Sequence, residues 1–66
     1  MEIKGRILAV DPGEKRIGFA ISDETQTLAR PLTVIKHVAR QVDAAAVAQL
    51  AADEGAVQII VGCALD

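Results

Sequence analysis

The residues best suited to chemistry lie in one short stretch, from Asp11 to Arg16. Asp11 ends an apolar run, and a carboxylate there costs free energy unless a metal ion or backbone donors partner it. Gly13 would let the turn take a positive φ and bring the backbone close to a bound group. Lys15 and Arg16 follow on the same turn, where they could contact a phosphate backbone. The stretch is therefore a candidate binding site for a cation and a phosphate.

The same residues also fit an ordinary turn. In Asp-Pro-Gly the Asp side chain caps the turn, Pro presets φ and Gly accepts the left-handed conformation. Lys15 and Arg16 would then be solvated charges of a hairpin. Gly18 favours the interpretation as a binding site. It has no side chain at the point of the second apolar run where a bulky residue would crowd Asp11.

Hydrophobic periodicity predicts five elements in the order βββαβ. They are strands over Ile7–Val10, Arg16–Ser22, Leu28–Lys36 and Val57–Val61, and a helix over Gln41–Glu54. Pro31 places the third strand at a sheet edge or at a strand start. The helix makes the last strand parallel to one of the first three. The continuous apolar run of that strand predicts burial on both faces.

Within the predicted helix, Val42, Ala46 and Leu50 share one face, which we expect to pack on the sheet. Asp43 lies in the first turn, where the helix dipole favours an anion. Gly55 is the residue expected just after the helix. Asp53 and Glu54, by contrast, lie at the end where the dipole disfavours acids.

The chain is small and apolar. It has 66 residues, of which 52% are hydrophobic, and its mean hydropathy is +0.34. A domain of this size buries only about 60% of the surface that its unfolded chain exposes. We therefore expect part of the apolar surface to be covered by a second copy, in a homodimer formed through an exposed sheet face or the outer edge of the last strand.

Cys63 is the single cysteine, so a disulfide framework is excluded, and a buried hydrophobic role is expected for its side chain. An unpaired cysteine fits a reducing compartment, and no apolar run approaches the ~18 residues of a membrane span. We expect a cytoplasmic protein without a membrane partner.

His37 follows a strand with no carboxylate predicted to orient it, which favours a surface role over general-base work.

Charge is distributed unevenly. All seven Lys and Arg lie in residues 1–40 with five acids, whereas residues 41–66 carry four acids and no base. Such asymmetry can indicate a side of the protein that faces a polyanion.

The chain resembles the YqgF/RuvX proteins, bacterial nucleases of the ribonuclease H-like superfamily. The matching motifs are Asp11-Pro12-Gly13, Lys15-Arg16-Ile17-Gly18, Ser22-Asp23, Arg30-Pro31-Leu32-Thr33-Val34-Ile35 and Val57-Gln58-Ile59-Ile60-Val61-Gly62. The departures are Glu14, where the family usually has Thr, and Cys63-Ala64, where it has Leu-Pro. The resemblance implies an α/β fold: a partial ribonuclease H-like mixed sheet, in strand order 3-2-1-4, with one helix on one face. Residues 1–66 would form a single truncated domain of this type.

The resemblance also implies a metal-dependent nuclease that acts on structured nucleic acid, RNA or branched DNA, in processing the 5′ end of pre-16S rRNA. Asp11 would be catalytic, the first of the carboxylates that hold Mg²⁺ or Mn²⁺. Asp66 could be a second ligand, because parallel strands end at the same edge, or a solvated terminal residue. Gly13, Lys15 and Arg16 would contact the nucleic acid. The chain would correspond to the N-terminal half of the family and be inactive alone.

Two alternatives remain open at this stage. One is a phosphate-binding element of the actin, Hsp70 and sugar-kinase class, whose members open with a similar Asp-x-Gly hairpin. Glu14 opposes it, because an acid would repel the phosphate. The other is a non-catalytic assembly module that keeps the fold without the chemistry.

Overall fold

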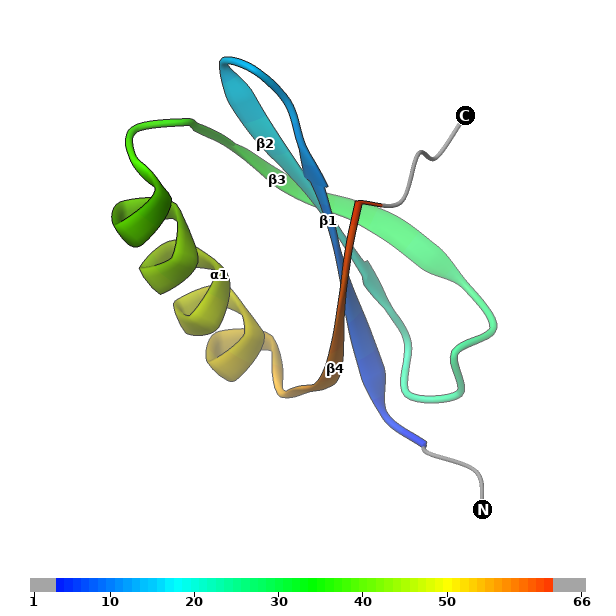
Figure 1. Ribbon diagram of the computed structural model, residues 1–66. Coiled ribbons are helices and arrows are strands. Elements are labelled where there is room, and N and C mark those ends of the chain that lie inside the picture. The colour runs from blue at the N-terminus through cyan, green and yellow to red at the C-terminus, as the bar shows by residue number, and fades with distance from the viewer. Residues whose placement is uncertain (1–3, 63–66) are drawn as a thin grey trace.

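Within residues 4–62, four strands form one mixed sheet, and a single helix lies against one of its faces (Figure 1). The computed structural model describes residues 4–62. The elements are β1 (Arg6–Pro12), β2 (Arg16–Ser22), β3 (Ala29–Lys36), α1 (Arg40–Glu54) and β4 (Ala56–Val61). The predicted order βββαβ is confirmed, and each boundary lies within two residues of its prediction.

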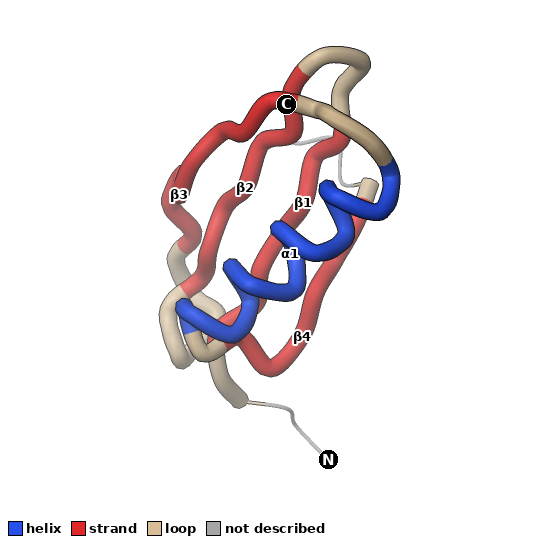
Figure 2. The backbone as a smooth tube through the Cα atoms, turned by 90° about the vertical axis from the view of Figure 1, so that its left-hand side faces the viewer, coloured by secondary structure: helices blue, strands red, loops and turns tan. Residues whose placement is uncertain are grey.

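The strand order is β3-β2-β1-β4, as the family resemblance implied. β1 pairs antiparallel with β2 and β2 antiparallel with β3, whereas β1 and β4 are parallel. Figure 2 shows α1 crossing the sheet between β3 and β4. β3 is an edge strand, which is where Pro31 was expected.

The core lies between the sheet and α1. Leu8 and Val10 of β1 pair with Ile21 and Phe19 of β2, so these four side chains share one sheet face. Ala51 of α1 completes this buried cluster together with Ile17. Apolar alternation at period two in β1 and β2 therefore selects the face that the helix covers.

The helix face that packs on the sheet differs from the predicted one. Val47, Leu50 and Ala51 contact the core, whereas Val42 is 52% exposed. The predicted face is therefore wrong at its first turn. Asp43 is the buried residue there, because its carboxylate is bonded to the segment that precedes the helix.

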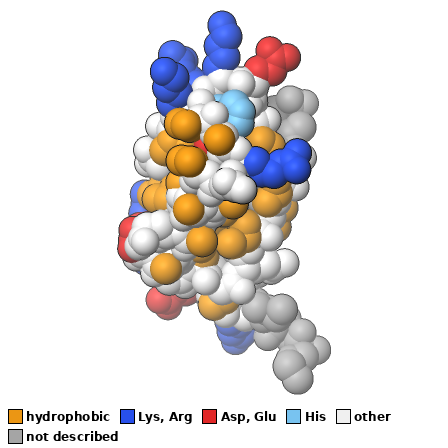
Figure 3. Space-filling model, turned by 60° about the vertical axis from the view of Figure 1, so that its left-hand side comes forward, with side chains coloured by type: hydrophobic (Ala, Val, Ile, Leu, Met, Phe, Trp, Pro, Cys, Tyr) orange, Lys and Arg blue, Asp and Glu red, His pale blue; other side chains and the backbone are white. Residues whose placement is uncertain are grey.

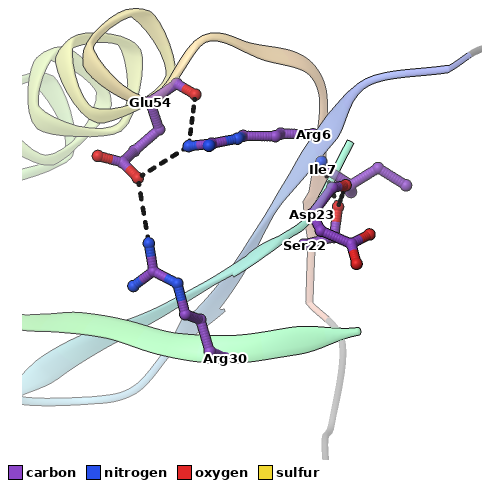
Figure 4. Close-up of polar contacts among 6 residues, drawn as sticks. All are labelled: Arg6, Ile7, Ser22, Asp23, Arg30 and Glu54. Atoms are coloured by element: carbon purple, nitrogen blue, oxygen red, sulfur yellow. Dashed lines mark hydrogen bonds and ion pairs between the residues drawn. The ribbon is translucent and has the colours of Figure 1, made fainter. Parts of the chain in front are cut away.

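Two arginines pair with the acid at the end of α1, where the helix dipole disfavours a negative charge. The Arg6 guanidinium donates to the Glu54 carbonyl oxygen at 3.5 Å and lies 3.7 Å from its carboxylate (Figure 4). Arg30 approaches the same carboxylate at 3.9 Å. Gly55 then ends the helix at φ 66°, as expected, and its N–H donates to the carbonyls of the last turn. Asp53 accepts a hydrogen bond from the Gln49 side chain at 2.8 Å.

Ser22 and Asp23 have structural roles at this same end of the sheet. The Ile7 N–H donates to Ser22 Oγ at 2.8 Å, beside the register shift between β1 and β4 (Figure 4). The Asp23 carboxylate accepts from the Thr27 N–H and the Thr25 hydroxyl. These bonds lower the pKa of Asp23, the Thr27 bond most. A polar turn at the end of β2 therefore accounts for both residues.

The prediction that the last strand is buried on both faces is wrong. Val57, Ile59 and Val61 of β4 are 55%, 43% and 64% exposed. Within residues 4–62, β4 is an outermost strand and pairs only with β1.

No helix of the described residues has the length and apolarity to cross a membrane.

Candidate functional site

Asp11 lies at the carboxyl end of β1, on the sheet face opposite α1. Its neighbour Val10 points into the core, so alternation along the strand places Asp11 on the other face. Asp11 pairs with Gly18, and Gly18 pairs with Val34, which sets these residues in a row across three strands. The Asp11 side chain is exposed. It therefore has direct access from solvent.

A hollow of about 340 Å³ lies over this open face. Ala9, Ala20 and Gly18 are among the residues that line it, and Asp11 lies at the end of the hollow where β1 ends. A Cβ added at Gly18 would lie 3.9 Å from the Asp11 Cβ, an ordinary contact. Alanine would therefore fit at position 18, and only a larger side chain would crowd Asp11.

The turn after β1 uses glycine for a reason other than the predicted one. Among the described glycines, positive φ occurs at Gly5, Gly55 and Gly62, so the expectation for Gly13 is wrong. The Gly13 N–H donates to the Arg16 carbonyl oxygen at 2.8 Å, and an added Cβ would lie 2.8 Å from that oxygen. Close approach of two backbone segments, not a left-handed conformation, requires glycine here.

Asp11 can supply one ligand to a hydrated ion. None of the ion pairs within residues 4–62 involves it. In the same range no three or more His, Cys, Asp or Glu side chains form a group that could hold a metal. Mg²⁺ is usually held by one or two protein carboxylates with water and phosphate oxygens, so a single exposed Asp fits part of such a site.

The end of β4 lies beside Asp11. Val61 pairs with Val10, and the Gly62 N–H donates to the Val10 carbonyl oxygen at 3.0 Å. Gly62 therefore lies next to the site. Asp66, the proposed second ligand, and Cys63 lie outside the described residues.

Basic side chains surround the turn beside Asp11. Lys15 and Arg16 are exposed, and Arg16 pairs directly across the sheet with Lys36. Figure 3 shows Lys and Arg side chains gathered near the histidine at this end of the molecule. Glu14, on the same turn, is the acid that opposes them.

His37 is oriented by a carboxylate, contrary to the prediction. Its Nδ1 bonds Asp43, whose other oxygen accepts from the Val38 N–H at 3.2 Å. Burial acts to raise the pKa of Asp43, but the Val38 bond and the bond and charge of His37 together lower it. The backbone N–H of His37 also donates to the Lys15 carbonyl oxygen at 2.9 Å. An acid in the first turn of a helix can reach back to the residues before it, a signal that the sequence already contained.

Comparison with known proteins points to one family. The family model of RuvX, described as Holliday junction resolvase, matches residues 5–66. A protein of Roseiflexus sp. (strain RS-1) named "Putative pre-16S rRNA nuclease" is 43% identical over 61 residues, which are 92% of this chain and 43% of that protein. A protein of the same name from Caulobacter sp. (strain K31) is 46% identical over 56 residues, which are 85% of this chain and 34% of that protein.

A third relative with this name, from Chloroflexus aggregans, is 42% identical over 59 residues, which are 89% of this chain and 42% of that protein. The chain thus spans less than half the length of the curated relatives that it matches. The family match covers every described element, including the Asp11 turn and β4. The chain belongs to the RuvX family.

Proposed function

We propose that this chain contributes the first catalytic carboxylate of a metal-dependent nuclease of the YqgF type. Its substrate would be structured nucleic acid, with processing of the 5′ end of pre-16S rRNA as its reaction. The observation that carries the proposal is Asp11, exposed at the carboxyl end of β1 beside the end of β4. The names of the relatives support a nuclease and pre-16S rRNA as its substrate.

Each residue of the site has a distinct role in this proposal. Asp11 binds Mg²⁺ or Mn²⁺, which when bound supplies an activated water and stabilises the leaving oxygen in phosphodiester cleavage. Lys15 and Arg16 neutralise phosphates of the bound strand. Gly13 contributes the tight turn rather than a donor, because its N–H is already bonded to Arg16. Asp66 remains proposed as a weak second ligand.

The family match favours a nuclease over the ATPase alternative. A nuclease assay on the chain alone separates the catalytic proposal from the assembly module only in part, because we expect the chain alone to be inactive. The decisive protein is a chimera in which this chain replaces the matching segment of the Roseiflexus relative. With that relative active as the positive control, the chimera should cleave an RNA carrying the 5′ precursor sequence of 16S rRNA in Mn²⁺.

The Asp11→Asn chimera should lose cleavage, while the Asp23→Asn chimera, altered at the other end of the sheet, should keep it. Cleavage by the Asp11→Asn chimera at the unaltered rate would refute the catalytic role. An inactive chimera beside an active relative would favour the assembly module.

We also propose that two copies of the chain pair through β4. Its outer edge has no strand neighbour within residues 4–62, and Val57, Ile59 and Val61 are exposed along it. Unpaired apolar edges readily pair with other chains, and two-fold symmetry is the commonest closed arrangement. Antiparallel pairing of two β4 strands would continue the sheet across the interface and bring these side chains beside those of the second copy.

A further inference from the structure

Four cations gather at the Asp11 end of the sheet. They are Lys15, Arg16, Lys36 and Arg40. Lys15, Arg16 and Lys36 line one open hollow at the tips of β2 and β3. The bond from His37 N–H to the Lys15 carbonyl ties the turn to the segment that leads into α1, where Arg40 begins the helix. The four cations therefore lie on backbone segments that are paired or hydrogen-bonded to one another.

These cations lack ion pairs within residues 4–62, in contrast to Arg6 and Arg30 at the opposite end. Arg6 and Arg30 both pair with the Glu54 carboxylate. None of the ion pairs seen within residues 4–62 involves any of the four cations named above. Asp43, the acid nearest to them along α1, is already bonded to His37 and Val38. Glu14 and Asp11 are the remaining acids of this end, so four bases face two acids.

Three of the four cations are placed where they work against folding. Arg16 and Lys36 are direct cross-strand partners, and like charges directly opposite destabilise a sheet. Arg40 is the first residue of α1, at the positive end of the helix dipole, where a cation is disfavoured. Local choices that conflict with stability are expected at functional sites, where a ligand supplies the compensation. The compensating ligand here must be anionic and must span two strand tips and a helix start.

We infer that this surface, formed by Lys15, Arg16, Lys36 and Arg40, binds the phosphate backbone of a nucleic acid strand. Lys36 and Arg40 are the new members of the contact, since Lys15 and Arg16 already belong to the proposed nuclease site. The strand would lie along the tips of β2 and β3 and pass the start of α1, so that phosphates approach Asp11 from the hairpin side. The inference deepens the proposed function and rests on it for the class of ligand.

The test measures binding of a fluorescein-labelled RNA hairpin by anisotropy in EDTA, where no cleavage occurs. Lys36→Gln and Arg40→Gln should each weaken binding, and each should reduce the slope of log affinity against log salt by about one. Arg30→Gln is the matched control: it removes the same charge from β3, at the opposite end. Equal weakening by Arg30→Gln, or unchanged binding by both test variants, would overturn the inference.

Thermal stability provides a second readout that a structural role would not produce. Lys36→Gln removes the repulsion from Arg16, so its melting temperature should equal or exceed that of the wild type while its RNA affinity falls. A lower melting temperature together with the weaker binding would contradict the inference, because lost folding would then explain the lost affinity.

The outcomes also separate this inference from the proposed nuclease. If Lys36 and Arg40 govern RNA binding while no form of the chimera cleaves, the surface stands and the nuclease proposal fails. If the chimera cleaves and depends on Asp11, yet both glutamine variants bind RNA like the wild type, the surface fails and the nuclease proposal stands.

Discussion

The Asp43 carboxylate, buried in the first turn of α1, bonds the ring of His37 at the end of β3. The same carboxylate accepts the Val38 N–H, so one side chain fixes the whole connection between the last hairpin strand and the helix. Because the backbone N–H of His37 donates to the Lys15 carbonyl oxygen, this connection positions the basic turn beside Asp11. The Asp43–His37 pair therefore contributes both to the stability of the fold and to the position of the basic turn.

The first prediction concerns pH. The pKa of Asp43 is lowered from its ordinary value of 3.8, so its charged form stabilises the folded state. That stability is fully present above the unfolded pKa and is lost as pH falls through the folded pKa. Urea unfolding of wild type and Asp43→Asn should therefore differ most near pH 5, and the difference should shrink as pH falls below 3.8. A difference independent of pH between 2.5 and 5 would contradict this.

The second prediction separates two glycines. Gly13→Ala should destabilise the chain by about 1–3 kcal/mol, because the new Cβ would press on the Arg16 carbonyl. Gly18→Ala should be neutral or stabilising by up to about 1 kcal/mol, since its Cβ meets only an ordinary contact. Chemical denaturation measures both. Equal destabilisation by the two variants would show that the turn geometry is wrong.

The third prediction concerns Ser22. Ser22→Ala leaves the Ile7 N–H without its acceptor and should cost about 1–3 kcal/mol of unfolding free energy. Thr25→Ala removes only exposed hydrogen bonds in the adjoining turn and should cost less than Ser22→Ala. Hydrogen exchange of the Ile7 amide should accelerate in the Ser22 variant alone. Unchanged exchange there would count against the bond.

The fourth prediction concerns self-association through β4. Sedimentation should show a dimer whose fraction rises with concentration, with a melting temperature that rises in parallel. Val61→Lys should weaken the dimer, because charged side chains block strand pairing at an edge. Val38→Lys alters an equally exposed valine, 65% against 64%, away from β4, and should leave it intact. A monomer at all concentrations, or equal loss in both variants, would refute the pairing.

Local signals in the sequence, the alternation in β1 and β2 and the Gly55 helix end, were sufficient to predict the element order and the position of Asp11. The strand order was implied by the family resemblance. The sequence was insufficient where contacts between residues distant in sequence determine the structure. The pairing of Glu54 with Arg6 joins residues 48 positions apart, and no local pattern shows it. The first turn of α1 was misassigned for a related reason: Val42 fits the apolar period, but the bonds of Asp43 bury the polar residue instead.

The apolar run of β4 was misread as doubly buried because composition does not show what lies beside a strand. Gly13 shows the same limit at short range. Glycine in a turn usually indicates a positive φ, whereas here the Arg16 carbonyl excludes a Cβ. The site prediction for Asp11 rested on its place at a strand end, which the structure retains. Its metal ligation stays a prediction.

Titration of Mn²⁺ against the 66-residue chain tests the central role of Asp11 most directly. Wild-type chain should bind Mn²⁺ weakly, because the described residues offer one carboxylate at the site. Asp11→Asn should abolish that binding, while Asp23→Asn, which alters a carboxylate at the opposite end, should leave it unchanged. Equal Mn²⁺ binding by wild type and Asp11→Asn would remove Asp11 from the role of metal ligand.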